Sequence, residues 1–261
     1  MPIHAYWAAL KAPDFETLPD DTVAILPFGA TEQHGPHLPL SVDTTLTDAV
    51  LAASLPHWSA ATNALILPTL TITKSNEHAE HAGSLALSAR TLLSVIEDIG
   101  ASVARAGIRR LVMLNGHGGN TAVLEIACRE LRIAHRLITA HASWFAFAET
   151  SPHIAPEAAA HDLHAGDIET SAMLAAAPNL VDMDKADDFP PKTHDWQANN
   201  RWTGLTGHAA RPGWVIDDLS PSGACGDASV ASADKGAAMI ESAAKNFAAF
   251  LEEFSRFDPA H

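Results

Sequence analysis

The chain has 261 residues, of which 47% are hydrophobic, so it can bury the core of a large α/β domain and is not a disordered chain. It has 16 lysines and arginines and 31 aspartates and glutamates, and the formal charge of −15 excludes nucleic acid as an expected partner. Neither an N-terminal signal pattern nor an apolar run of about 18 residues is present, and the two cysteines form no CxxC pair, so we expect a cytoplasmic enzyme with no membrane partner and no thiolate zinc site.

The first half of the chain alternates short apolar runs with amphipathic stretches. Residues 22–29 and 65–70 predict buried strands, and residues 43–54 predict a helix between them. Residues 88–106 predict a second helix, because apolar side chains recur at helical spacing and Ser88 is suited to cap its first turn.

The second half continues the same alternation. Residues 109–114 predict a third strand, a helix follows to about residue 135, and residues 136–141 predict a fourth strand. Residues 168–177 and 234–254 predict two further helices. Strands that alternate with helices predict a mostly parallel sheet covered on both faces, which is a three-layer α/β/α architecture.

The region between the last two predicted helices has a different composition. Residues 186–230 are rich in Pro, Gly, Asp and Trp and have weak periodicity, which predicts an extended loop region that lines the site. No internal repeat and no linker is evident. We therefore interpret residues 1–261 as a single domain.

The first segment with chemical potential follows the first predicted strand. In an extended backbone, residues i and i+2 point to the same side, so Glu32 and His34 can face one ion. Asp43 comes a few residues later, after residues 38–40, where the chain can turn back toward Glu32 and His34. Two carboxylates and an imidazole suit Zn, Mn or Fe(II). On these residues alone, a polar loop with Asp43 as a helix cap is an equally good interpretation.

The second segment is Asn-Gly-His-Gly-Gly-Asn at residues 115–120, directly after the third predicted strand. Ligands bind outside the carboxyl ends of strands in open α/β sheets. The glycines around His117 allow close approach of the backbone and free N–H groups for an anion. A nucleotide loop or a serine hydrolase is disfavoured, because GxGxxG, GxxxxGK[ST] and GxSxG are all missing.

The third segment is His-Ala-Gly-Asp-Ile-Glu-Thr-Ser at residues 164–171. His164 precedes a predicted helix and can project into a cleft. Asp167 and Glu169 stand in the first turn, where the helix dipole favours acidic residues, and we prefer this interpretation for Asp167. A fourth stretch, residues 75–84, is dense in His and Glu but fits neither HExxH nor HxxEH, so alone it indicates a polar loop.

Together these segments resemble the creatininase family. ILPFGATEQHGPHLPLSVD is similar to the opening motif of the family, LVMLNGHGGN to its central metal-binding loop, and HAGDIETSAML to its third motif. Weaker matches in the same order are SNEHAEHAGSLALS and PSGACGDASVASADKG. The likeness runs from about residue 20 to about residue 245. It implies a creatininase-like three-layer α/β fold, two divalent metal ions per chain, and a homo-oligomer, often a hexamer.

The resemblance also implies the metal ligands. Glu32 and His117 would bind one ion, His34 would bind the other, and Asp43 would bridge them. Zn is the preferred metal, with Mn or Fe as alternatives. Because an imidazole ligand needs its other nitrogen held, His34 and His117 should each have a hydrogen-bond acceptor behind them.

Two further positions follow from the resemblance. Creatininase proper carries another metal ligand where this chain has Gly119, and in relatives with NGHGGN the position of Glu169 looks like the replacement. His164 matches the catalytic histidine of the family. The expected reaction is attack of a hydroxide, formed on the metal pair, on the carbon of a non-peptide, cyclic or formamide-type amide, with His164 as proton donor to the leaving nitrogen.

The substrate is left open. The substrate-side candidates are Glu77, His78, Gly118, Gly119 and Trp144. A Trp that precedes HAG in creatininase proper is missing here, and AGS replaces PGT, so creatinine itself is in question. A formamide, a lactam or hydantoin-like ring and a short peptide remain as small amide substrates. The alternatives are a non-catalytic metal-dependent small-molecule binder, a peptide-maturing hydrolase of the same family, and a nucleotide-binding module.

Overall fold

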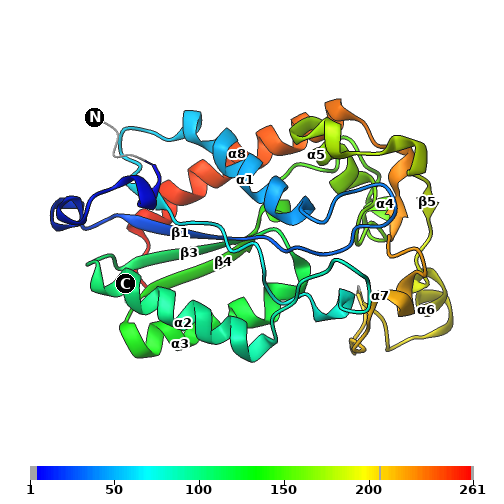
Figure 1. Cartoon of the computed structure of the whole chain (residues 1–261), viewed down its shortest axis with the longest axis horizontal. Coiled ribbons are helices and arrows are strands. Elements are labelled where there is room, and N and C mark those ends of the chain that lie inside the picture. The colour runs from blue at the N-terminus through cyan, green and yellow to red at the C-terminus, as the bar shows by residue number, and fades with distance from the viewer. Residues whose placement is uncertain (1–4, 206, 260–261) are drawn as a thin grey trace.

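A parallel sheet of four strands forms the centre of the computed structural model, which describes residues 5–205 and 207–259 (Figure 1). The strand order is β2-β1-β3-β4, and every neighbouring pair is parallel. The strands are β1 (Val23–Phe28), β2 (Ala64–Ile66), β3 (Arg110–Asn115) and β4 (Ile138–Ser143). The predicted α/β class with a mostly parallel sheet is confirmed.

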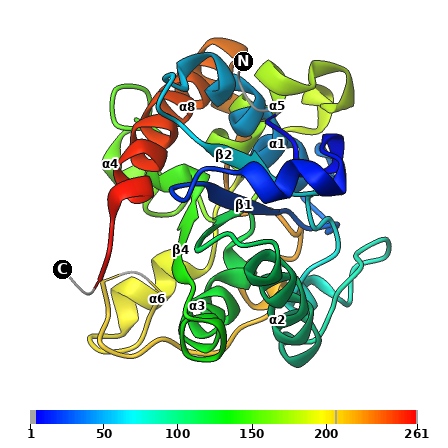
Figure 2. The same cartoon turned by 90° about the vertical axis from the view of Figure 1, so that its left-hand side faces the viewer.

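Long helices cover both faces of the sheet, as Figures 1 and 2 show. They are α1 (Val42–Ser54), α2 (Ala89–Arg105), α3 (Thr121–His135), α5 (Asp167–Ala176) and α8 (Ala233–Arg256). Helices α1 and α8 lie over one face, and α2 and α3 lie over the other. Ser88 caps α2 as predicted, because its side chain accepts a hydrogen bond from Thr91 N at 3.1 Å.

Strand β1 is apolar throughout because both of its faces are buried. In β1, Val23 and Ile25 pack into the apolar cluster on the side of α1 and α8. Ala24, Leu26 and Phe28 pack into the cluster on the side of α2 and α3. A central parallel strand therefore reads as a continuous apolar run instead of an alternating one.

Two predicted strands have different bounds in the structure. The run 65–70 forms only the short strand β2, because Pro68 has no N–H to donate, and the chain rejoins the sheet at Leu70 through an isolated bridge to Phe28. The run 136–141 begins pairing only at β4, because Arg136 adopts a left-handed conformation with φ of 57° at the end of α3.

Residues 186–230 are not one extended loop, which corrects the prediction. They contain the helices α6 (Thr193–Asn199) and α7 (Ile216–Leu219), and strand β5 (Asp188–Phe189) pairs antiparallel with β6 (Gly226–Asp227). A small apolar cluster holds them together: Trp196, Leu205, Trp214, Ile216, Leu219 and Cys225. Elements of this length are too short to show a helical period, so their apolar residues read as isolated.

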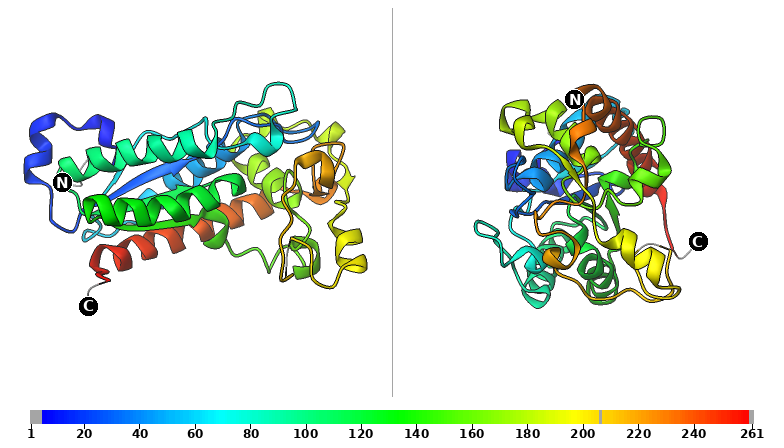
Figure 3. Two further views of the ribbon diagram at one scale, coloured as in Figure 1. Left: turned by 90° about the horizontal axis from the view of Figure 1, so that it is seen from below. Right: turned by 90° about the vertical axis from the view of Figure 1, so that its right-hand side faces the viewer.

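The short elements gather at one end of the molecule, past the carboxyl ends of the strands (Figures 1 and 3). Helix α4 (Pro156–Ala159) lies there with α6 and α7. Within the described part of the chain, no helix is long and apolar enough to span a membrane. A single domain over residues 1–261 stays a prediction. Residues 1–4, on which the expectation of no signal pattern partly depends, lie outside the described residues.

Candidate metal centre

The side chains that the sequence predicts as metal ligands meet at the carboxyl ends of β1 and β3. Glu32 and His34 follow β1, and His117 follows β3. Asp43 lies in the first turn of α1, and Glu169 in the first turn of α5. All five are buried, with relative exposures of 0% to 8%. Segments far apart in sequence thus deliver polar groups to one interior point at the ligand-binding edge of the sheet.

Asp43 lies between two histidines and faces each with a different oxygen. Its Oδ1 is 3.4 Å from His34 Nε2, and its Oδ2 is 3.6 Å from His117 Nδ1. Glu32 Oε1 lies 3.1 Å from His117 Nδ1, and Glu169 Oε2 lies 3.9 Å from His34 Nε2. The cluster thus contains two metal-ligand groups that share Asp43, one with Glu32 and His117 and one with His34 and Glu169.

Three atoms of this cluster are buried without any hydrogen-bond partner. They are Glu32 Oε1, His34 Nε2 and Asp43 Oδ2. A buried polar atom without a partner costs about 1–3 kcal/mol, and such atoms are rare in folded proteins. Here all three belong to residues of the same cluster. A divalent cation would satisfy them together, so the residues present fit a metal site.

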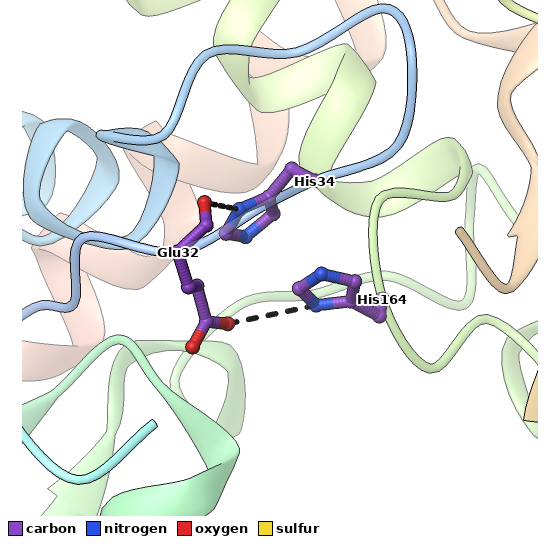
Figure 4. A group of neighbouring side chains, drawn as sticks. All are labelled: Glu32, His34 and His164. Atoms are coloured by element: carbon purple, nitrogen blue, oxygen red, sulfur yellow. Dashed lines mark hydrogen bonds and ion pairs between the residues drawn. The ribbon is translucent and has the colours of Figure 1, made fainter. Parts of the chain in front are cut away.

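Both candidate imidazole ligands are held from behind by main-chain carbonyls. His34 Nδ1 donates to the carbonyl oxygen of Glu32 at 3.0 Å (Figure 4), and His117 Nε2 donates to that of Lys74 at 2.9 Å. The nitrogens left to face the cluster are His34 Nε2 and His117 Nδ1. This arrangement turns a lone pair toward the cation site. The expectation of an acceptor behind each histidine is confirmed.

The charges of the cluster depend strongly on one another. Burial alone lowers the pKa of His34, but the carboxylates of Asp43 and Glu169 raise it to about 9. Burial also lowers the pKa of His117, yet the negative charge of Glu32, whose Oε1 lies 3.1 Å from His117 Nδ1, keeps it well above the usual value. Burial raises the pKa of Glu32, but the contact with His117 brings it well below the usual range. Positive charge is therefore favoured inside this cluster.

Glu169 is positioned by an unusual turn. Burial raises the pKa of its carboxyl group to about 7, although His34 opposes the rise. Its Oε2 accepts a hydrogen bond from Ala165 N at 2.6 Å. Ala165 has a φ of 56°, a left-handed conformation that residues with a side chain rarely adopt. Such strain is concentrated at functional sites.

His164 lies between two other histidines. Its ring centroid is 4.2 Å from that of His34 and 4.4 Å from that of His78. Its Nε2 is 2.7 Å from the carbonyl oxygen of Gln33, and its Nδ1 lies 3.8 Å from Glu32 Oε1 (Figure 4). Burial, with the charge of His34 next, lowers the pKa of His164 well below the usual value. A neutral ring with its Nδ1 lone pair toward Glu32 can accept a proton or bind a cation, and Glu32, His34 and His164 form a third group suited to a metal.

The side chain of Glu77 fills the space next to Gly119. A Cβ on Gly119 would collide with Glu77 Oε1 and with His117 Nε2. Glu77 Oε1 lies 3.5 Å from His117 Nε2, and its Oε2 is 2.6 Å from Lys74 Nζ. Burial raises the pKa of Glu77, but His117 and Lys74 bring it down to about 2. Glu77 therefore stabilises a candidate ligand from behind, and a side chain at position 119 would require Glu77 and His117 to move.

A cavity of about 270 Å³ lies beside the cluster. Gly118 is the substrate-side candidate that lines it, and apolar lining comes from Phe145, Leu163 and Ile168. The lining also includes the carboxylates of Asp43, Asp162 and Glu169. His78, another substrate-side candidate, is buried and faces Glu32 instead of the cavity, with its Nε2 3.6 Å from Glu32 Oε1.

Trp144 does not reach the cavity, which corrects its assignment as a substrate-side residue. It is fully buried in the apolar cluster on the α8 side of the sheet. Its ring stacks on that of Phe145 with centroids 4.0 Å apart, and Phe145 lines the cavity. The two residues lie in one 3-10 turn, where neighbouring side chains point in different directions. An aromatic side chain is present, but one position later than expected.

Asp167 stays apart from the metal-ligand groups, as the sequence analysis preferred, but its role is larger than that of a helix cap. Its Oδ2 is 2.7 Å from Lys235 Nζ, and Ser171 Oγ donates to its Oδ1 at 2.8 Å. The carboxylate is buried, so this contact joins α5 to the first turn of α8. A partner 68 positions away in sequence gives no local signal.

Gln33, which has no predicted role, lies at the centre of several contacts in the structure. Its side chain is buried, and its Nε2 lies 2.8 Å from His78 Nδ1 and 2.9 Å from the carbonyl oxygen of Gly223. The one signal in the sequence was its place between Glu32 and His34, since a residue between two ligands in an extended chain points away from them.

Several known proteins are similar in sequence to this chain, and they belong to the creatininase family or are related to it. The sequence model of the creatininase family, described as creatinine amidohydrolase, matches residues 8–251. The mycofactocin precursor peptide peptidase of Mycobacterium tuberculosis is 32% identical over 243 residues, which cover 88% of this chain and 86% of that protein. The creatinine amidohydrolase of Pseudomonas putida is 34% identical over 189 residues, 66% of this chain and 71% of that one. The match to the Mycobacterium ulcerans peptidase, at 36% identity, spans 61% of its length.

Solved structures give the same result. A crystal structure of creatinine amidohydrolase is 30% identical, covers 96% of this chain and 98% of its own, and has a TM-score of 0.77. A manganese form of creatininase has a TM-score of 0.75 at 30% identity, with coverage of 96% and 98%. A mutant creatininase of the Zn–Zn type, 28% identical with the same coverage, also has a TM-score of 0.75. Structural neighbours of this chain thus carry Mn or Zn.

Proposed function

The chain belongs to the creatininase family of hydrolases, and from this premise we propose that it is a dinuclear metal-dependent amidohydrolase that cleaves a non-peptide, cyclic or formamide-type C–N amide bond. The observation that carries the proposal is the set of three buried, unpartnered atoms on Glu32, His34 and Asp43. A non-catalytic binder of the same fold would have no need of His164 beside such a set. Zn is our preferred metal, with Mn or Fe as alternatives.

The proposed sites share one bridging residue. Glu32, Asp43 and His117 would hold one ion, and His34, Asp43 and Glu169 would hold the other. The two oxygens of Asp43 face different histidines, which supports the bridging role. Glu169 would then replace the ligand that Gly119 cannot supply. Its raised pKa suits a carboxyl group that becomes charged only when a cation is bound.

Bound divalent ions would supply an activated water as the nucleophile and would polarise the amide carbonyl group. The protein groups have separate tasks. The Nε2 proton of His164 is directed to the Gln33 carbonyl, so Nδ1 is the atom that can take a proton and pass it to the leaving nitrogen. The N–H group of Gly118 is proposed to stabilise negative charge on the carbonyl oxygen. Phe145 and Leu163 would exclude water from this side.

The cavity also supports a statement about substrate charge. Among the described residues that line it, acidic side chains are present and Lys and Arg are absent. An anionic substituent next to the scissile bond would therefore meet carboxylates and no lysine or arginine. We propose a substrate that is uncharged around the amide and carries an apolar group against Phe145.

A second candidate is hydrolysis of a short peptide. It is favoured by the 32% identity, over 88% of this chain, with a protein named as a peptide peptidase. The same metal chemistry and the same role of His164 would serve either substrate. The two candidates differ only in what occupies the cavity beyond the amide group.

A single preparation tests both candidates. The protein, purified without chelator, should contain close to two divalent ions per chain by elemental analysis. It should then be assayed with Zn and with Mn on formamides, cyclic amides and short peptides. Absence of metal, together with no uptake when Zn or Mn is added, would overturn the proposal. Turnover of peptides alone would select the second candidate.

A further inference from the structure

We propose that Gln33 is a positioning residue that fixes the tautomers of His78 and His164, so that one presents an N–H group and the other a lone pair to Glu32. This inference depends on the proposed function and goes beyond it, because Gln33 neither binds the metal in that proposal nor lines the cavity.

The amide orientation of Gln33 is determined by two main-chain partners. Its Oε1 accepts a hydrogen bond from Gly35 N at 2.9 Å, and its Nε2 donates to the carbonyl oxygen of Gly223 at 2.9 Å. An N–H group can only donate and a carbonyl can only accept, so exchanging the amide oxygen and nitrogen would lose both bonds. Gly35 and Gly223 have φ of 67° and 78°, backbone conformations that glycine adopts readily.

The second proton of the amide determines the state of His78. Gln33 Nε2 lies 2.8 Å from His78 Nδ1, and because the amide nitrogen is a donor, Nδ1 must be the acceptor. In a neutral imidazole the proton is then on Nε2. That nitrogen lies 3.6 Å from Glu32 Oε1, so His78 presents an N–H group to the carboxylate.

The main-chain carbonyl of Gln33 determines the tautomer of His164, which presents a lone pair to Glu32 where His78 presents an N–H group. His164 Nε2 lies 2.7 Å from the carbonyl oxygen of Gln33, which only accepts, so the proton is on Nε2. The side-chain amide of Gln33 is 3.3 Å from the same nitrogen, but both of its protons already have acceptors. His164 Nδ1 is left without a proton, 3.8 Å from Glu32 Oε1.

Gln33 therefore fixes opposite hydrogen-bonding roles for the nitrogens that His78 and His164 turn toward Glu32. Glu32 Oε1, which has no hydrogen-bond partner, faces a donor on His78 and an acceptor on His164. The donor can hold the carboxylate in place while its oxygen binds a cation. The acceptor can take up a proton during hydrolysis. A loss of Gln33 contacts should disturb the first arrangement and leave the second, which depends on main-chain atoms.

The test is Gln33→Glu in the zinc-loaded protein, followed by imidazole ¹⁵N NMR. The variant keeps the acceptor for Gly35 N but replaces the donor by an oxygen that faces His78 Nδ1. We expect wild-type His78 to carry its proton on Nε2 and the variant to carry one on Nδ1, while His164 keeps its tautomer. Zinc affinity or kcat should fall about 10–100-fold, with KM less affected. Gln197→Glu, at an exposed position, is the matched control.

The outcomes separate this inference from the proposed function. His78 with its proton on Nδ1 in the wild type, or a His78 spectrum unchanged in Gln33→Glu, would overturn the inference even in an active enzyme. The predicted tautomers in a protein that hydrolyses no amide would overturn the function alone. If Gln33→Glu does not fold, Gln33→Met serves the same purpose, since His78 should then lose its preference for the Nε2 proton, and an unchanged preference would contradict the inference.

Discussion

The two sides of the cavity are built differently. The side with the metal-ligand candidates stands at strand ends, and His34 and Asp43 are 0% and 2% exposed. The apolar side comes from a 3-10 turn with Phe145 and from the segment before α5, where Leu163 is 37% exposed. The proposed chemistry thus depends on rigid, desolvated groups, whereas substrate selection falls to segments that tolerate change more easily. The following predictions test this division.

The largest effect is expected for Asp43→Ala on the metal side. As the shared residue of both groups, Asp43 should be needed by both ions, so the variant should lose both metals and all activity. His34→Ala should mainly weaken one ion. Elemental analysis and turnover measure both variants. Normal metal content in Asp43→Ala would show that Asp43 merely caps α1 and that the two sides do not differ as described.

His164→Ala should have the next largest effect, and it separates chemistry from binding. If His164 moves a proton, the variant should keep two metals and its melting temperature, while turnover falls by roughly 10²–10⁴. The loss should be smaller for substrates with a weakly basic leaving amine. A ligand would lose metal in step with activity, and a structural histidine would lose stability with turnover per folded molecule nearly unchanged. Full activity with intact metal would remove His164 from the mechanism.

Glu169→Gln and Asp167→Asn compare two acidic residues of the same helical turn. Glu169→Gln should reduce the occupancy of one metal and leave the other. Asp167→Asn should keep both metals and destabilise the fold by about 1–3 kcal/mol, because it weakens buried contacts with Lys235 and Ser171. Metal titration and thermal unfolding distinguish the two. Equal loss of metal in both variants would contradict the assignment of Glu169.

Local signals in the sequence indicated only part of the metal side. The i, i+2 spacing of Glu32 and His34 suits an extended chain, and the predicted strands place both residues and His117 at one edge of the sheet. The resemblance to the creatininase family supplied the rest of the ligand set, because on the residues alone Asp43 suited a helix cap equally well. Contacts between residues far apart in the sequence could not be predicted, because they leave no local pattern. The carbonyl of Lys74 behind His117 and the ion pair of Asp167 with Lys235 are long-range contacts.

The apolar side was harder to predict for a related reason. A short turn has no period, so nothing in the sequence distinguishes the buried Trp144 from Phe145, which faces the cavity. The same holds for residues 186–230, whose short elements depend on one small cluster of apolar side chains. Period-based reasoning therefore describes the sheet and its long helices, and it fails where elements are only a turn long.

The smallest effect is expected for Phe145→Ala, which removes apolar surface from the cavity and no polar group. Its ring lines the cavity but neither accepts nor donates protons. Truncation should therefore weaken substrate and transition state about equally, which raises KM while kcat changes little. We expect a rise of about tenfold for substrates with an apolar substituent, in line with the 1–3 kcal/mol that a hydrophobic pocket contributes to discrimination. Unsubstituted formamide should show almost no change. Phe257→Ala, whose ring is 51% exposed at the far end of α8, is the matched control. A fall in kcat with unchanged KM would place Phe145 in the chemical step, and the two sides of the cavity would then share one task.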